Sequence, residues 1–280
     1  MNWWCSATGA EWTWQWQPYP GVWLFVLSLV AGYGAVRWRL LRAHPSRNWP
    51  GWRTALFLVG TVLLWLATDW PLGTLGAGYL LSAHTAQYLL LALMGPALVL
   101  LGFPGWAAEA AWNARAGRLL RGLVRPVPSL LAFNAILFVT HVPSVVDGLM
   151  PSQLGSLAID LSWIVGGLWL WWPALAPERA GGLSPMGRIG YLFASTVPPT
   201  IPAAFLTFAD YPLYGLYELA PRVGLSAHDD QQLAGLLMKF GADPVIWLAM
   251  AVVFFRWQAA ITPPDSAAAE SPAPAPGVSV

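Results

Sequence analysis

Five polar or ionisable side chains stand inside long apolar segments of this 280-residue chain, and their chemistry is the first indication of a site. These residues are His84, Tyr88, His141, Asp160 and Lys239. Imidazole, phenol and carboxylate groups can ligate a metal ion or pass a proton, whereas an ammonium group is a fixed cation. Because ionisable groups are costly in apolar surroundings, they often mark function there. The sequence therefore predicts a metal site, a proton path or a buried ion-pair network built from four separate segments.

Lys239 also has a candidate partner on its own segment. Asp243 follows it by four residues, a spacing that permits an ion pair on one helix face. Asp160, on another segment, is an alternative partner, and the sequence leaves this choice open. An unpaired ammonium in lipid would cost several kcal/mol, so we expect a carboxylate beside it and an intramembrane charge network of Lys239, Asp243 and Asp160.

The composition shows which solvent surrounds these side chains. Hydrophobic residues make up 57% of the chain and charged residues only 10%, against about 25% in a typical soluble domain. The net charge of +1 argues against a nucleic-acid partner, and the high apolar content argues against a disordered chain. The single Cys5 excludes an intramolecular disulfide. We expect a membrane protein in a lipid bilayer, not a soluble enzyme.

Long apolar runs without strict alternation predict an all-α fold, a polytopic bundle of seven transmembrane helices. Prolines interrupt several of these spans, and we expect kinks where they lack an N–H donor; they are Pro96, Pro198, Pro199, Pro202 and Pro244. The predicted spans are Gly21–Val36, Thr54–Thr68, Leu75–Phe103, Val127–Val142, Leu154–Ala176, Ile189–Ala209 and Gln231–Trp257.

The arginines predict the orientation of this bundle. Eleven of the thirteen fall in connections on one side of the membrane, Arg256 closes the last span on that same side, and Arg222 alone falls on the other. The positive-inside rule then places the N-terminus outside and the C-terminus in the cytoplasm. We divide the chain into an outer Trp-rich segment (1–20), the membrane domain (21–257) and a Pro- and Ala-rich cytoplasmic tail (258–280) that we expect to be disordered.

Within this topology the polar side chains gather in the outer half of the membrane. His84 lies roughly 15 Å below the outer edge, and Gln87 and Tyr88 share its helix face. His141, Asp160 and Lys239 reach comparable depths on other spans. Met238 is a soft donor that could favour Cu(I), with packing in the core as the alternative.

Several motifs in order resemble one family, the CtaG-type cytochrome c oxidase assembly factors. They include the ten residues from Ser82 to Leu91 (SAHTAQYLLL) leading to Pro96, and His141-Val142-Pro143. Trp171-Trp172-Pro173, Leu183-Ser184-Pro185 and the run from Asp229 to Met238 (DDQQLAGLLM) follow. The family-motif residues singled out are Gln87, Pro96, Asp230, Gln231, Gln232 and Met238.

This resemblance implies a multi-pass, non-enzymatic protein of the bacterial plasma membrane that matures a haem–copper oxidase of the caa type. Its partners would be haem–copper oxidase subunits, its cofactor would be copper, and a homo-oligomer stays open. The candidate metal ligands are His84, His141, Tyr88 and Asp160. Tyr88 and Asp160 stand where the family pattern has His, and Lys239 where it commonly has Trp, so we expect weak copper binding at best.

Three other functions stay open at this point. The first is a structural partner of the oxidase that keeps the fold without the metal. The second is a proton or ion transporter that uses Asp160, Asp243 and Lys239. The third is a retinal-binding protein with a Schiff base on Lys239, against which the third span offers no carboxylate as a counterion.

Overall fold

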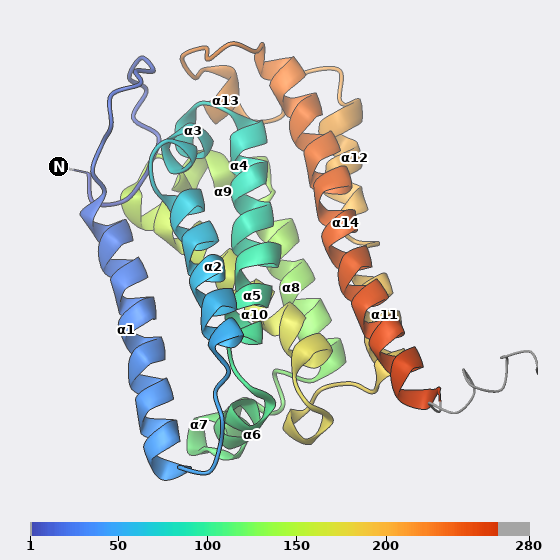
Figure 1. Ribbon diagram of the computed structural model, residues 1–280. Helices are drawn as coiled ribbons and strands as arrows, with labels where there is room; N and C mark the ends of the chain where they lie inside the picture. Colours follow the sequence, from blue (N-terminus) through green and yellow to red (C-terminus); the bar gives the residue numbers. More distant parts are fainter. Residues whose placement is uncertain (1, 263–280) are drawn as a thin grey trace, which may run out of the picture.

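The computed structural model describes residues 2–262, and the regular elements in that range are all helical (Figure 1). Six spans are long and apolar enough to cross a membrane. They are α1 (Pro20–Ala43), α2 (Gly51–Thr68), the span Leu81–Leu101, α10 (Gln153–Leu175), the span Pro185–Phe208 and α14 (Ala227–Ile261). The all-α membrane fold expected from the sequence is therefore confirmed.

The predicted fourth span is the reason why the count is six or seven. Here α8 (Pro126–Thr140) has 15 residues, which is roughly 22 Å at 1.5 Å per residue and short of the ~30 Å apolar layer. A second helix, α9 (Pro143–Leu149), continues at an angle of 71°. Seven spans result only when this bent pair counts as one.

Short helices close the two ends of the bundle (Figure 1). At one end α3 (Leu72–Gly78), α9 and α13 (Gly215–Glu218) gather beside the N-terminal residues. We call residues 2–19 the strap and this end the strap end. The opposite end holds α6 (Gly105–Asn113), α7 (Arg115–Leu120) and the 3₁₀ turn Glu178–Ala180. Arginine-bearing connections meet there; which end faces the cytoplasm stays a prediction.

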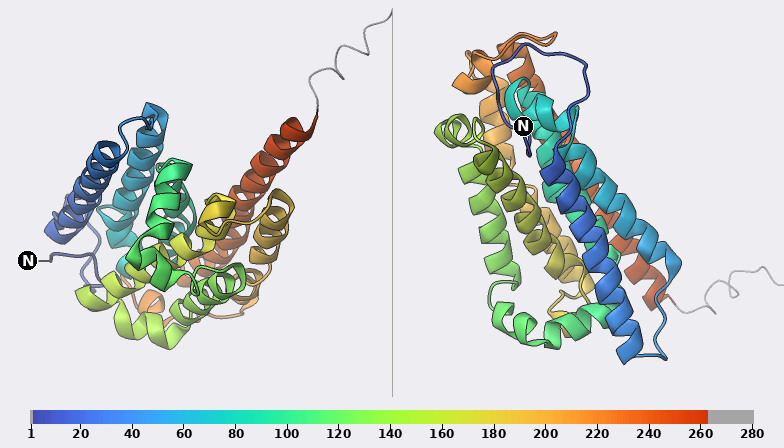
Figure 2. Two further views of the ribbon diagram at one scale, coloured as in Figure 1. Left: turned by 90° about the horizontal axis from the view of Figure 1, so that it is seen from below. Right: turned by 90° about the vertical axis from the view of Figure 1, so that its left-hand side faces the viewer.

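Two spans form the centre of the bundle. They are α10 and the span made of α4 (Leu81–Tyr88), the π-helical segment Leu89–Met94 and α5 (Gly95–Leu101), each 56% buried over its apolar window. By contrast α1 is 6% buried and stands at the edge against α2 (Figure 2). Such an apolar, unburied helix suits contact with lipid.

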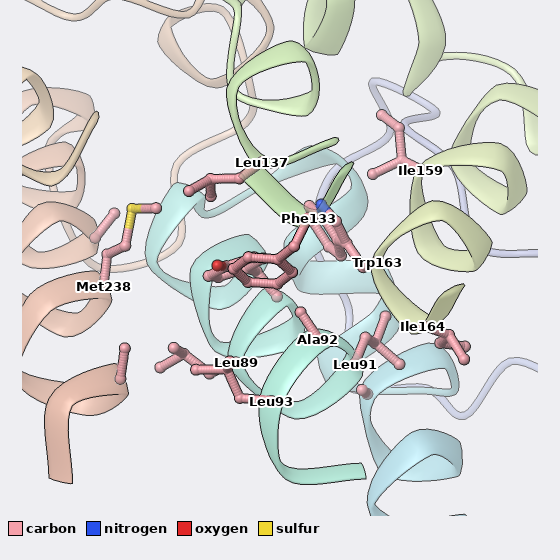
Figure 3. Packing of buried hydrophobic residues seen from close by; sticks show 14 of the residues in the cluster. Leu89, Leu91, Ala92, Leu93, Phe133, Leu137, Ile159, Trp163, Ile164 and Met238 are labelled. Atoms are coloured by element: carbon pink, nitrogen blue, oxygen red, sulfur yellow. The ribbon is translucent and has the colours of Figure 1, made fainter. Parts of the chain in front are cut away.

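Side chains of the π-helical segment meet three other helices in the core (Figure 3). The packed residues are Leu89, Leu91, Ala92 and Leu93, with Phe133 and Leu137 from α8, Ile159, Trp163 and Ile164 from α10, and Met238 from α14. Gly167 of α10 lets the helices approach, since a Cβ there would lie 2.2 Å from the Ala92 carbonyl oxygen. The site described below is built on this rigid contact.

The prolines act differently in the three spans that they interrupt. Pro96 follows the π-helical segment, where its missing N–H disturbs the ordinary ladder. Pro198 and Pro199 break the span Pro185–Phe208 between α11 (Pro185–Ser195) and α12 (Thr200–Phe208). Pro244 lies inside α14, which continues past it.

Several predicted span boundaries are wrong, and the first span, for example, ends at Ala43 instead of Val36. The third span begins at Leu81 instead of Leu75, because α3 is a separate helix that ends at Gly78. The last span, α14, runs to Ile261, so residues 258–261 are helical and do not belong to a disordered tail. The remainder of the predicted tail, residues 263–280, lies outside the described residues.

The strap is packed into the bundle, although its tryptophans suggested an interfacial segment. Trp4 is 2% exposed and Cys5 is 1% exposed, whereas Trp14 is 68% exposed. The Ala7 N–H donates to the Met150 carbonyl at 3.0 Å. The Tyr79 hydroxyl donates to the Ala10 carbonyl at 2.8 Å. These bonds fasten the strap to α3 and to the segment after α9.

Candidate functional site

Three of the predicted site residues meet around one tryptophan that the sequence did not single out. The ring centroid of Trp163, on α10, lies 4.9 Å from that of His84, 5.5 Å from that of Tyr88 and 6.1 Å from that of His141. The rings of Tyr88 and His141 are 5.1 Å apart. We call these four residues the Trp163 cluster; Figure 3 shows its tryptophan among the packed core side chains.

The cluster draws on three elements that hold its members firmly. His84 and Tyr88 lie four residues apart on one face of α4. His141 follows the last residue of α8, and its Nδ1 lies 2.8 Å from the Leu137 carbonyl oxygen. The Tyr214 hydroxyl donates to the His141 carbonyl at 2.7 Å. The imidazole of His141 is therefore fixed at the end of its helix.

Several nitrogens of this cluster have no hydrogen-bond partner. Neither ring nitrogen of His84 nor Nε2 of His141 forms a hydrogen bond of good geometry with a described residue, although these atoms are buried and the Gly76 backbone approaches His84. The exposed fractions of the two side chains are only 2% and 9%. A buried polar atom without a partner costs about 1–3 kcal/mol, and such an atom in a native fold calls for an explanation. Unpaired imidazole nitrogens are also the atoms that a metal ion or a hydrogen-bonding partner would need.

Asp160, the fourth predicted ligand, is bonded to the strap. Its Oδ2 accepts a hydrogen bond of 2.8 Å from Nε1 of Trp4. Asp160 stands three residues before Trp163 on α10, so it lies one turn nearer the strap end than the cluster. Within residues 2–262, no three His, Cys, Asp or Glu side chains are arranged to hold a metal ion. Copper binding stays a prediction.

The rest of the strap is fastened around this bond. The backbone N–H groups of Trp3 and Trp4 lie 2.8 and 3.3 Å from Oε1 of Gln153. The thiol of Cys5 donates to the Thr68 carbonyl at 3.2 Å and lies 3.8 Å from the Thr74 hydroxyl. Burial raises the pKa of the Cys5 thiol far above its usual range, so the thiol stays neutral. The strap thus covers the bundle end that leads to the Trp163 cluster.

Lys239 belongs to a different place, near the break between α11 and α12. Its Nζ lies 3.1 Å from Oδ2 of Asp243 and donates to the Thr200 hydroxyl at 2.8 Å. Among the residues that the structure describes, Asp160 forms no ion pair. The predicted network of three charges is therefore two separate sites, and of the two carboxylates Asp243 is the one that pairs with Lys239.

A small cavity joins Lys239 and Asp243 to Tyr88. It offers about 10 Å³ to the centre of a water molecule, and it is also lined by Ser195 and Met238. That volume holds roughly one water and is far below the ~300 Å³ of a typical ligand pocket. This cavity is therefore too small to hold a retinal chromophore. Tyr88 and Lys239, two of the three departures from the family pattern, face this one cavity.

The remaining motif residues connect helices. Asp230 accepts the N–H groups of Leu81 and Ser82 at 2.5 and 3.2 Å, and also the Ser82 hydroxyl. It thereby caps the first turn of α4. Gln231 accepts the Leu213 N–H at 2.6 Å, and Gln87 donates to the Ala67 carbonyl at 2.8 Å.

Two further motif residues make no such links. Pro96 adjoins the π-helical segment, and Gln232 is half-buried with no side-chain hydrogen bond to a described residue. Met238 is fully buried in the core, as the packing alternative expected.

Sequence reasoning missed Trp163, Trp4 and Thr200. Trp163 lies one helical turn from Asp160, so its spacing alone could have marked it. Trp4 bonds to Asp160, which is 156 residues away in the chain, and Thr200 bonds to Lys239, which is 39 residues away. No local sequence pattern predicts contacts over such separations.

Within residues 2–262 the regular elements are all helical, six or seven spans are apolar and a polar cluster is buried near one end, which together indicate a multi-pass membrane protein. The model of the cytochrome c oxidase caa3 assembly factor family (Caa3_CtaG) matches residues 31–260. The chain therefore belongs to this family, as its motifs indicated. No curated protein and no solved structure gives a significant match.

Proposed function

We propose that this protein is a non-enzymatic assembly factor for a haem–copper cytochrome c oxidase, embedded in the bacterial plasma membrane with the strap end outside. The family match over residues 31–260 is the observation that carries the proposal. The arginines at the opposite end of the bundle support the orientation, because positive connections stay in the cytoplasm.

We further propose that the Trp163 cluster is the functional site. Its three unpaired imidazole nitrogens are a cost to the fold that a role in contact with cargo or partner would explain. Two imidazoles are too few for a closed metal site, and the nearby Tyr88 oxygen is a hard donor that suits Cu(I) poorly. The cluster supports a weak, transient contact with copper as cargo, or a scaffold for the oxidase, better than a resident copper ion.

Genetics tests the assembly role. Deletion of the gene is expected to lower the haem and copper signals of the oxidase in membrane spectra, and the wild-type gene should restore them. His84→Ala is expected to restore them poorly, whereas His44→Ala, which removes an exposed imidazole at the other end of the bundle, should restore them fully. An unchanged oxidase in the deletion strain would remove the assembly role. Full rescue by His84→Ala would remove only the Trp163 cluster from it.

A copper titration separates the two forms of the proposal. Purified protein should compete weakly for Cu(I) against a chelator of known affinity, and His84→Ala should abolish what remains. Weak competition that His84→Ala abolishes would support contact with copper as cargo, and no competition would support the scaffold. Tight binding of one Cu(I) per chain, lost in His84→Ala and kept in His44→Ala, would contradict both forms and indicate a resident copper ion.

A further inference from the structure

The break between α11 and α12 leaves backbone oxygens without donors in the middle of a span. Pro198 and Pro199 have no N–H, so the carbonyls of Ala194 and Ser195 lose the bonds that an unbroken helix would give them. No other N–H or hydroxyl of the described residues donates to either oxygen. The C-terminal end of α11 therefore presents free carbonyls and the negative end of its helix dipole.

Ser195, at the end of α11, lines the same small cavity as Lys239, and two side-chain oxygens contact the ammonium there. Oδ2 of Asp243 and the hydroxyl of Thr200 lie 3.1 and 2.8 Å from Nζ of Lys239. The Thr200 hydroxyl donates in turn to the Thr196 carbonyl at 3.2 Å, so its lone pairs remain for the ammonium. Gly235 makes this closeness possible, since a Cβ there would lie 2.3 Å from Oγ1 of Thr207 on α12.

The chemistry of these oxygens indicates which kind of ion they would bind. The two oxygens that contact the ammonium, a carboxylate and a hydroxyl, are hard donors with a single formal negative charge, which one monovalent cation balances, and the end of α11 borders the same cavity at Ser195. Helix ends and unwound carbonyls coordinate monovalent cations in the broken spans of membrane transporters. An ordinary surface ion pair between residues four apart on one helix needs neither a broken neighbouring helix nor an additional hydroxyl beside the ammonium.

We propose that the α11–α12 break is a binding site for a monovalent cation and that the ammonium of Lys239 fills it in this chain. The tethered cation holds α12 against α14 without any ion from solution. The free space of about 10 Å³ beside Lys239 is near the size of one water, so the site has no room for a second occupant of greater size. This inference does not depend on the role of the protein in oxidase assembly.

Truncation of the lysine should reopen the site to ions. Lys239→Ala is purified in detergent, and its melting temperature is measured in sodium, potassium, ammonium or choline chloride at equal ionic strength. We expect a low melting temperature in choline and a saturable rise of about 3–6 °C in at least one small cation at ten times its Kd. The wild type should melt at the same temperature in all four salts.

Two variants serve as matched controls. Lys239→Met fills the same space with an apolar chain, and Lys239→Ala combined with Asp243→Asn removes the charge that would bind the ion. Neither should respond to the choice of cation. Equal melting of Lys239→Ala in all four salts would overturn the proposal, as would a response that persists with Asp243→Asn.

Purification in each salt covers the case in which Lys239→Ala is too unstable for melting curves. Recovery of folded protein in sodium, potassium or ammonium but not in choline supports the cation site. Equal loss in every salt overturns it, because an ion that bound the vacated site would rescue the fold.

Discussion

Asp230 and His84 are equally buried, at 2% exposure each, yet they differ in how their polar atoms are used. The carboxylate of Asp230 accepts three hydrogen bonds at the start of α4, while three residues after Leu81 the imidazole of His84 forms none. Burial alone therefore does not separate structural from functional polar residues in this bundle. The completeness of their hydrogen bonds distinguishes these two residues from each other.

The same contrast in hydrogen bonding separates the carboxylates around the strap from the Trp163 cluster. Around the strap, Asp147 accepts the N–H groups of Gly215 and Leu216 at 3.1 and 3.0 Å, and Asp160 accepts from Trp4. These carboxylates link segments far apart in the chain. The Trp163 cluster, one turn deeper, contains three of the ten buried side-chain atoms without partners among the described residues, all of them imidazole nitrogens, while two more, Nε1 of Trp12 and of Trp70, lie in and beside the strap. These bonded carboxylates thus surround a site in which Trp163 donates to Thr140 but three imidazole nitrogens have no partner among the residues that the structure describes.

The largest expected loss of stability follows removal of the Asp230 side chain. Asp230→Ala leaves the N–H groups of Leu81 and Ser82 without their acceptor and removes an anion from the start of α4. We expect a loss of about 2–4 kcal/mol, since hydrogen bonds to a charged group are worth about 1.5–3 kcal/mol. Thermal unfolding in detergent measures it.

Asp229 provides the control for that variant. Its side chain is exposed and bonds only to Ser226 at the start of α14, so Asp229→Ala should cost less than about 1 kcal/mol. Similar losses for the two variants would show that the charge at the membrane surface matters more than the cap on α4.

A smaller effect is expected at the strap, where Cys5 is a natural reporter. Asp160→Asn replaces the carboxyl acceptor of the Trp4 N–H with an amide, and we expect the bond to weaken by about 1–1.5 kcal/mol. Opening of the strap should become about tenfold more frequent, and alkylation of Cys5 by a maleimide should accelerate equally. Trp14→Phe, a change at an exposed tryptophan, should leave the rate unchanged. An unaltered rate in Asp160→Asn would show that the other strap contacts suffice.

The pH dependence of that reaction follows from the raised pKa of the Cys5 thiol. The docked strap keeps the proton, whereas the open strap has a thiol of ordinary pKa, about 8.5. Docking is therefore at full strength below pH 8.5 and weakens as the pH rises above it. Alkylation of Cys5 should keep rising with pH above 8.5, where a free thiol levels off. A plateau at pH 8.5–9 would contradict this coupling.

The sequence predicted the elements of this fold better than their contacts. Apolar runs and arginine spacing give the spans and the shared end of the basic connections, because both depend on local composition. The break at Pro198 and Pro199 was expected from proline chemistry. The separation of α3 from the third span was not, since residues 75–80 are as apolar as the helix that follows.

The candidate site shows the same limit. His84 and Tyr88 could be placed on one face from their spacing, and Lys239 could be paired with Asp243 for the same reason. The position of Asp160 depends on Trp4, a partner 156 residues away, and depth alone suggested a place beside Lys239 that the structure does not give it. Depth along a span predicts height in the membrane but not which neighbour a side chain faces.

The smallest change in stability is expected at His84, whose buried ring nitrogens have no hydrogen-bond partner among the described residues. His84→Leu removes two buried nitrogens that have no partner and replaces the ring with an apolar side chain of similar size. The relief of the unpaired polar atoms should offset the altered packing, so the melting temperature should stay within about 3 °C of the wild type or rise. Oxidase maturation should nevertheless fall in a strain that carries this variant. A loss of stability comparable to that of Asp230→Ala would instead assign His84 a structural role, and the contrast between the two residues would no longer mark the functional site.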